Sequence, residues 1–251
     1  MSKNSKVAIQ ETYTLPSGGK LYGDNTIDQV TLRAMTTNDE KMRLSSTGLN
    51  VIPDLIKRCV VSPENLDVYD LKMFDLHYLM YKLRTVTYGP EYKLNLTCNH
   101  CNKPIEMKID LDSIPVREVP EDFKEPFVIG PLPVSGEIIE ARLLSIRDFI
   151  NIDREATRIK SKFEEYEGDP EYILNYKYKI VSIDGQAPNP AKIQNWIENL
   201  HARDARYFDS KYDEISSRYG MDLHVFDICP KCGEEIEFDL IVTTEFFRPK
   251  Y

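Results

Sequence analysis

Two cysteine pairs with the same internal spacing constrain this 251-residue chain more than any other feature of its sequence. Cys98 and Cys101 form the first Cys-x-x-Cys pair, and Cys229 and Cys232 form the second. Each pair lies between two segments of alternating apolar and polar residues, which predicts a β-hairpin with the cysteines at its turn. A structural zinc ion takes four tetrahedral ligands, and one pair supplies only two. The sequence therefore predicts a single four-cysteine zinc ribbon, with one structural zinc ion per chain held between opposite halves of the chain.

Two other roles for these cysteines agree less well with the surrounding residues. A redox-active Cys-x-x-Cys pair usually opens a helix, whose N-terminus lowers the thiol pKa, but β-forming residues follow both pairs here. A disulfide requires an oxidising compartment, and the N-terminal residues do not resemble a signal peptide. Each cysteine pair and the residue after it form a tight turn, called a knuckle below. The residue after the pair is Asn102 in one knuckle and Gly233 in the other, where a left-handed backbone favours asparagine or glycine. Zinc binding is therefore the interpretation that the residues favour.

The two halves of the sequence repeat one another in the same order. The cysteine pairs lie 131 residues apart (229 − 98), and so do the Tyr-Gly dipeptides at residues 88–89 and 219–220 (219 − 88). Further matching segments are Leu15–Gly19 with Leu132–Gly136, Thr31–Thr36 with Glu140–Ser145, Asp39 with Asp148, and Asp75–Leu79 with Asp204–Phe208. This order predicts an internally duplicated α+β fold, in which two units of small antiparallel sheet and helices share the zinc ribbon. We place the units at residues 12–110 and 127–247, with a proline-rich connector at 111–126.

Helical periodicity and capping signals place several helices within each unit. Thr36, with Asp39 three residues later, has the pattern of a capping box, which predicts a helix to about Leu44. Further helical patterns cover residues 50–61, 67–88, 146–165, 170–183 and 188–219. Short strands are expected at residues 12–15, 20–22 and 29–35. Each unit is therefore expected to run from sheet to helices and then to half of the zinc site.

Charge balance and the lack of catalytic motifs limit the function. The chain carries 32 basic and 41 acidic residues, a formal net charge of −9, which disfavours binding to phosphate backbones. No apolar segment approaches the ~20 residues that cross a bilayer. The sequence has no glycine-rich phosphate loop, nucleophile elbow or histidine–carboxylate cluster. The recurring Arg33/Arg142 and Asp39/Asp148 suit structural roles. We therefore expect no enzyme activity and no small-molecule substrate.

A motif in the first half resembles a known family of phage proteins. Its residues are Asp75, Leu79, Leu83-Arg84, Tyr88-Gly89, Tyr92 and Cys98-x-x-Cys101. The motif is similar to the baseplate hub and hub-assembly proteins of T-even-type contractile-tailed phages (myophages). The Leu-Pro-Ser-Gly turn at residues 15–18 and the segment at residues 32–39 are also similar to that family, and the resemblance covers residues 12–241. It implies a protein that binds other tail proteins while the hub assembles in the host cytoplasm, and it leaves open whether the protein stays in the virion baseplate.

Two functions from different classes remain open at this point. The first is a structural or assembly protein of a phage baseplate hub, which docks to other hub or tail proteins. The alternative is a zinc-ribbon regulator that contacts nucleic acid or RNA polymerase, although acidic residues follow the second cysteine pair. For the first function we predict a docking surface on the helices before each pair, with contact residues Tyr78, Tyr81, Tyr207 and Tyr212. An equally consistent interpretation is that these tyrosines cover the core.

Overall fold

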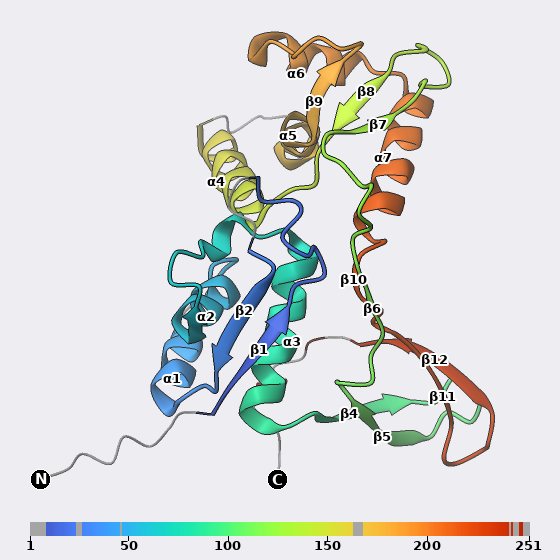
Figure 1. The fold of residues 1–251 in the computed structure, drawn as a ribbon. Helices are drawn as coiled ribbons and strands as arrows, with labels where there is room; N and C mark the ends of the chain where they lie inside the picture. Colours follow the sequence, from blue (N-terminus) through green and yellow to red (C-terminus); the bar gives the residue numbers. More distant parts are fainter. Residues whose placement is uncertain are drawn as a thin grey trace, which may run out of the picture.

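The computed structural model describes residues 9–23, 27–45, 47–162, 168–240, 242 and 246–247. Within these residues lie seven α-helices and several small antiparallel sheets (Figure 1). The helices are α1 (Thr37–Ser45), α2 (Val51–Cys59), the 3-10 helix η1 (Val68–Asp70), α3 (Met73–Tyr88), α4 (Ile146–Lys162), α5 (Pro170–Lys179), α6 (Pro190–Asn199) and α7 (Ala202–Ser216). The strands are β1 (Gln10–Thr14), β2 (Gln29–Arg33), β3 (Val60–Ser62), β4 (Glu91–Thr97), β5 (Pro104–Asp110), β6 (Val116–Arg117), β7 (Phe127–Ile129), β8 (Ile139–Ala141), β9 (Ile180–Ile183), β10 (Gly220–Met221), β11 (His224–Ile228) and β12 (Glu235–Asp239). The predicted α+β class is confirmed.

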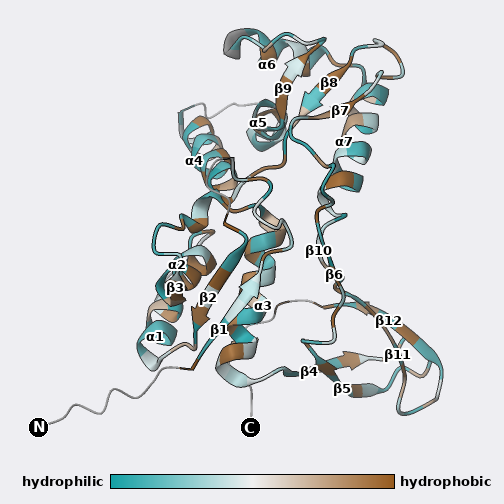
Figure 2. Ribbon diagram, in the orientation of Figure 1, coloured by the Kyte–Doolittle hydropathy of each residue, from teal (hydrophilic) through white to brown (hydrophobic). Residues whose placement is uncertain are grey.

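The first sheet consists of β1, β2 and β3 in that order, with antiparallel neighbours. Strand β2 alternates between the two faces, so Val30 and Leu32 are fully buried. Helix α2 adds Leu55 and Ile56 to the same apolar cluster, and α3 packs against both α2 and β2. Figure 2 shows the hydrophobic colour on β2 and on the neighbouring α2. The period-two pattern of β2 thus fixes which face of the sheet its helices cover.

The second sheet has the same layout, with β7, β8 and β9 in order and antiparallel neighbours. Ile139 and Ala141 of β8 are fully buried. Tyr176 of α5 stacks on Phe208 of α7, with ring centroids 5.2 Å apart, in the cluster that contains both β8 residues. In Figure 1 this sheet lies at the top of the view, and α4 lies between it and the first sheet. Each sheet therefore has its own apolar cluster and its own covering helices.

Two of the predicted helices end earlier than the sequence indicates. The helix expected to run to Val61 ends at Cys59, and the one expected to run to Ile183 ends at Lys179. The residues that follow form β3 and β9, the third strand of each sheet. They are rich in β-branched side chains, which favour a strand, and they pair with β2 and β8. Pairing with a distant strand overrides the local helical pattern here.

Two smaller expectations need correction, and two others are described in part or agree with the structure. Residues 20–22 form turns instead of a strand, and η1 with its own Asp67 cap precedes α3, so the long helix begins at Met73. The pattern at residues 188–219, expected to hold one or two helices, contains two, α6 and α7. The predicted helix at residues 146–165 is described as α4 to Lys162, and residues 163–165 lie outside the described part of the chain.

The two cysteine hairpins, β4–β5 and β11–β12, lie together at the end of the molecule away from the second sheet (Figure 1). The connector expected at residues 111–126 contains β6, which pairs with β10. Tyr81 of α3 donates a hydrogen bond to the backbone oxygen of Leu240, 3.2 Å away, just after β12. Cys229 and Ile236 also belong to the apolar cluster of the first sheet. The second hairpin is therefore anchored on the first unit, although it comes from the second half of the sequence.

Candidate metal centre

The two knuckles are built by the same backbone contacts. In the first, the N–H of Cys98 donates to the oxygen of Lys103 (3.0 Å), and the N–H of Asn102 donates to the oxygen of Cys98 (2.9 Å). In the second, Cys229 donates to Glu234 (2.9 Å), and Gly233 donates to Cys229 (2.9 Å). The residue after each pair is left-handed, with φ of 54° at Asn102 and 79° at Gly233. The sequence prediction for these two positions is confirmed.

The two knuckles bring the sulfur atoms of all four predicted ligand residues close together. The sulfur atoms of Cys98, Cys101, Cys229 and Cys232 all lie within 4.8 Å of one another. The Sγ atoms of Cys98 and Cys232, from opposite halves of the chain, are 3.8 Å apart. A tetrahedral zinc with sulfur at about 2.3 Å requires sulfur–sulfur distances of about 3.8 Å. The donor set and its spacing therefore fit a tetrahedral thiolate metal site.

The groups around the four sulfur atoms favour the binding of a cation between them. Burial opposes ionisation of the Cys229 thiol, but the backbone N–H groups of Lys231 and Cys232 lower its pKa to about 7. The Glu234 N–H also favours ionisation of Cys232, yet desolvation and the three neighbouring thiols raise the pKa of Cys232 to about 12. Ionisation of one thiol thus opposes ionisation of its neighbours. A bound divalent cation removes this effect, because it stabilises every thiolate around it.

Four protein ligands fill a tetrahedral metal site completely. Catalytic zinc sites keep one position for water or substrate, and structural sites do not. Cys98 and Cys229 are 2% and 1% exposed, so half of the donor set lies in the core. The arrangement can therefore hold the two halves of the chain together, but it offers no coordination position to a substrate.

The tyrosines predicted as a contact surface are mostly in the core. Tyr78, Tyr81 and Tyr212 are 8%, 1% and 5% exposed, whereas Tyr207 is partly buried. The Tyr212 hydroxyl donates to the backbone oxygen of Arg142 at 3.1 Å. A side chain this deeply buried offers almost no contact area to a partner. The structure agrees with the second interpretation for these three residues, in which tyrosines cover the core.

The recurring Arg–Asp pairs form two matching structural clusters. Asp39 accepts hydrogen bonds from the N–H and hydroxyl of Thr36 at 2.9 and 2.8 Å, and Arg33 contacts both of its oxygens. Arg58 is the third residue that contacts Asp39. Burial opposes ionisation of Asp39, but its contacts with Arg33, Thr36 and Arg58 hold its pKa well below the usual range. Asp148 makes the same contacts with Ser145 and Arg142. Both clusters therefore cap the helix that follows the middle strand of a sheet.

A second pair of aspartates ties each proline turn to a helix. Asp204 accepts from the N–H groups of Val134 and Ser135 at 2.7 and 2.9 Å. Asp75 accepts from the N–H of Ser17 at 3.0 Å and from the hydroxyl of Tyr22. Burial raises the pKa of Asp75 to about 6. The pKa of Asp204 is lowered instead, because its two N–H contacts outweigh the effect of burial. In each half, the turn thus contacts the aspartate of that same half, at positions that match between the halves.

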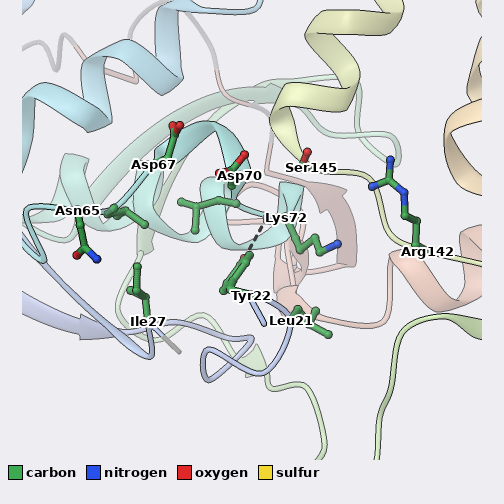
Figure 3. Close-up of a pocket in the computed structure, with 11 residues that line it drawn as sticks. Leu21, Tyr22, Ile27, Asn65, Asp67, Asp70, Lys72, Arg142 and Ser145 are labelled. Atoms are coloured by element: carbon green, nitrogen blue, oxygen red, sulfur yellow. Dashed lines mark hydrogen bonds between the residues drawn. The ribbon is translucent and has the colours of Figure 1, made fainter. Parts of the chain in front are cut away.

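Sequence reasoning missed a buried ion pair between the first unit and the connector. Lys72, 6% exposed, lies 2.9 Å from a carboxylate oxygen of Glu125 and donates to the oxygen of Leu143 at 2.9 Å. It lies beside a cavity of about 310 Å³ that residues from both halves line (Figure 3). The other charged groups of this lining are also paired, Arg142 with Asp148 and both Asp67 and Asp70 with Arg147. No sequence spacing marks Lys72, because its partners are distant along the chain.

The fold is an α+β arrangement in which four cysteines from both halves of the chain lie close enough together to bind a metal ion. A family model described as T4 bacteriophage base plate protein matches residues 8–248. The chain belongs to this family and is a T4-type phage baseplate protein. No curated protein and no solved structure matches the chain. No helix in the described part of the chain has the length and apolar character to cross a membrane.

Proposed function

We propose that this protein is a structural or assembly component of the baseplate hub, and that it acts by docking to other tail-hub proteins without catalytic turnover. The observation that carries the proposal is the family match over nearly the whole chain, residues 8–248. The closed donor set supports it, because four cysteines around one point leave no position for a substrate. The formal charge of −9 also favours protein partners over nucleic acid.

The test is to combine the purified chain with each hub and tail protein of the same phage and to record native mass spectra. We expect a complex of fixed stoichiometry with at least one hub protein. The same samples are mixed with DNA and RNA at physiological salt. A chain that ignores every tail component yet retards nucleic acid would replace the hub assignment with the zinc-ribbon regulator.

We further propose one structural zinc ion per chain, held by Cys98, Cys101, Cys229 and Cys232. Its support is the 4.8 Å limit on the distances between the four sulfurs and the strand flanks of both knuckles. Because each half supplies two ligands, the binding energy of zinc becomes folding energy for the whole chain. Native mass spectrometry of the purified protein reads the zinc content directly.

Internal duplication is part of the same proposal, with units at residues 12–110 and 127–247. Both sheets have three antiparallel strands and a register shift in the pairing of the middle and third strands, at residues 31–32 and 140–141. The capping clusters, turn contacts and knuckles recur in the same order along the chain. The second unit adds α6, which has no counterpart helix of that length among the described residues of the first. Superposition of the halves in a crystal structure tests the proposal, and different strand orders would contradict it.

Assembly is proposed to take place in the host cytoplasm. The family match supports the baseplate as the destination. Quantitative mass spectrometry of purified virions then distinguishes a resident hub subunit, present at fixed copy number, from an assembly factor that leaves.

A further inference from the structure

The second cysteine hairpin has an apolar outer face. Phe226 is 74% exposed, the highest value among the large apolar side chains of the described residues, and Ile228 is 60% exposed. Both point to the same side of β11, because they are two residues apart in a strand. The inner side carries Ile236 and Phe238, which pack toward the core. A two-stranded hairpin that exposes this much apolar surface is costly in water unless something covers it.

The first hairpin provides an internal comparison for this face. Asn95 and Thr97 of β4 lie where Phe226 and Ile228 lie in β11, at the offset of 131 residues that relates the knuckles (226 − 95 and 228 − 97). The outer positions of β4 and β5 are exposed and polar apart from Pro104. The same backbone is therefore stable with a polar outer face. The fold does not require Phe226 and Ile228 to be apolar.

Acidic residues of β12 lie directly across the hairpin from Phe226 and Ile228, which together form the apolar stripe of β11. In the register of β11 and β12, Ile228 faces Glu235, Phe226 faces Glu237, and His224 faces Asp239. Cross-strand neighbours lie close enough to form one surface. The equivalent of Asp239 in the first hairpin is Lys108, so the second hairpin is both more apolar and more acidic.

We propose that the outer face of the β11–β12 hairpin binds a basic polypeptide segment of another baseplate protein, with an apolar side chain of that segment on Phe226 and Ile228. Three carboxylates beside the stripe attract lysine or arginine side chains. The same carboxylates disfavour a symmetric contact with a second copy, which would face them with themselves, and they repel nucleic acid. This inference rests on the proposed function and adds the location and chemistry of the contact.

The metal site gives this face a fixed shape. Ile228 precedes the ligand Cys229, and Glu235 follows the knuckle by two residues. The hairpin strands are tied by five residue pairs and by the four-cysteine cluster at their turn. A surface that is ordered before binding loses little conformational entropy when the partner arrives.

The test measures binding of the full-length, zinc-loaded chain to each purified tail and baseplate protein of the same phage, one at a time, by biolayer interferometry. The variant Phe226→Asn with Ile228→Thr carries the residues that the first hairpin uses at these positions, so it should fold and keep its zinc. A charge variant, Glu237→Lys, has its matched control in Glu106→Lys on the first hairpin. Val128→Thr controls for loss of an exposed apolar side chain, because Val128 of β7 is 60% exposed.

We expect one basic protein to bind the wild-type chain. Its affinity should fall at least about 10-fold with the double variant and several-fold with Glu237→Lys. The two controls should stay within about 2-fold, and the wild-type affinity should weaken as salt is raised. A hub protein that binds the wild type and both hairpin variants equally would overturn the inference and leave the proposed function intact. Self-association of the wild type that the double variant abolishes would assign the face to a second copy. Failure of every tail protein to bind the wild type would overturn the proposed function as well.

Discussion

The two cysteine hairpins are alike on the side that faces the core and different on the exposed side. Their knuckles share the same backbone hydrogen bonds and left-handed residue, and their inner sides pack into one apolar cluster. On the outer side, Asn95 and Thr97 of one hairpin stand where Phe226 and Ile228 stand in the other. The four-cysteine cluster constrains the inner half of each hairpin, because each hairpin supplies two of its sulfurs. The outer half is free to differ, and there only one hairpin is apolar.

Asp75 and Asp204, at matching positions in the two halves, likewise share a contact but differ in their surroundings. Both hold a proline turn against the start of a helix, and both are fully buried. Asp204 accepts two backbone N–H bonds, which lower its pKa, whereas Asp75 accepts one N–H and a tyrosine hydroxyl and has its pKa raised to about 6. A matching position in the sequence therefore fixes the contact but not its electrostatics.

Loss of one cysteine from either hairpin should have the largest effect. Cys98→Ser and Cys229→Ser should each abolish tight zinc binding and destabilise both halves, because structural zinc contributes on the order of 10 kcal/mol to folding. Zinc content by native mass spectrometry and thermal unfolding measure the two effects. Cys59→Ala is the control, since Cys59 is buried away from the site and should keep the zinc. Two zinc ions per chain, or none in metal-replete protein, would contradict a shared site.

Removal of the capping aspartates should come next. Asp39→Ala should lower the free energy of unfolding by about 3 kcal/mol, because it leaves two arginines and a helix N-terminus without their acceptor. Asp148→Ala should cost less, since Arg142 is the one arginine that pairs with it among the described residues. Urea unfolding of both variants gives the comparison. Equal losses would mean that the Arg58 contact of Asp39 contributes nothing measurable.

The parts of this structure that sequence predicts are those set by residue type at short spacing. The four cysteines and the Thr36–Asp39 cap belong to this group, because ligand geometry and helix ends allow few alternatives. The strands β3 and β9 could not be predicted as such, since the strand that pairs with each lies far away in sequence. The tyrosines could not be assigned either, because an amphipathic ring fits a core and a contact surface equally well.

The buried aspartates should respond differently to pH. The pKa of Asp75 is raised in the folded state to about 6 from 3.8, so its contribution to stability is largest at low pH and is lost as pH rises through about 6. Asp75→Asn removes this titration, so wild type should lose about 1.4 kcal/mol relative to the variant between about pH 5 and about pH 8. The pKa of Asp204 is lowered, and the cost of Asp204→Asn should stay constant over that range. Urea unfolding at both pH values measures each difference. Parallel pH profiles for the two variants would contradict the contrast.

Exchange of the outer faces sharpens the hairpin comparison. A chain with Phe226→Asn and Ile228→Thr that also carries Asn95→Phe and Thr97→Ile has the apolar stripe on the first hairpin. We expect it to remain about 10-fold weaker than wild type in binding the hub protein, because Lys93 and Lys108 lie beside the transferred stripe. Biolayer interferometry at low and physiological salt measures the affinity. Full recovery would mean that the contact does not need the carboxylates of Glu235 and Asp239, whose places in the first hairpin are taken by Pro104 and Lys108.

The smallest effect should come from the charged end of the second hairpin. His224 lies 2.8 Å from Asp239 and 3.7 Å from Glu237, and the hydrogen bond to Asp239 raises its pKa above 6.5. A raised pKa means that the stabilisation is fully present below about pH 6.5 and is lost as pH rises through the folded-state value. His224→Gln should therefore lower the free energy of unfolding slightly at about pH 6 and leave it unchanged at about pH 9. An NMR titration of the imidazole gives the pKa directly. At the same place in the first hairpin, Lys93 faces Lys108, and Lys93→Gln is the matched control, because it changes the corresponding position without removing an imidazole. Equal pH dependence in the two variants would assign the effect to the rest of the chain and leave the His224–Asp239 pair without a measurable contribution.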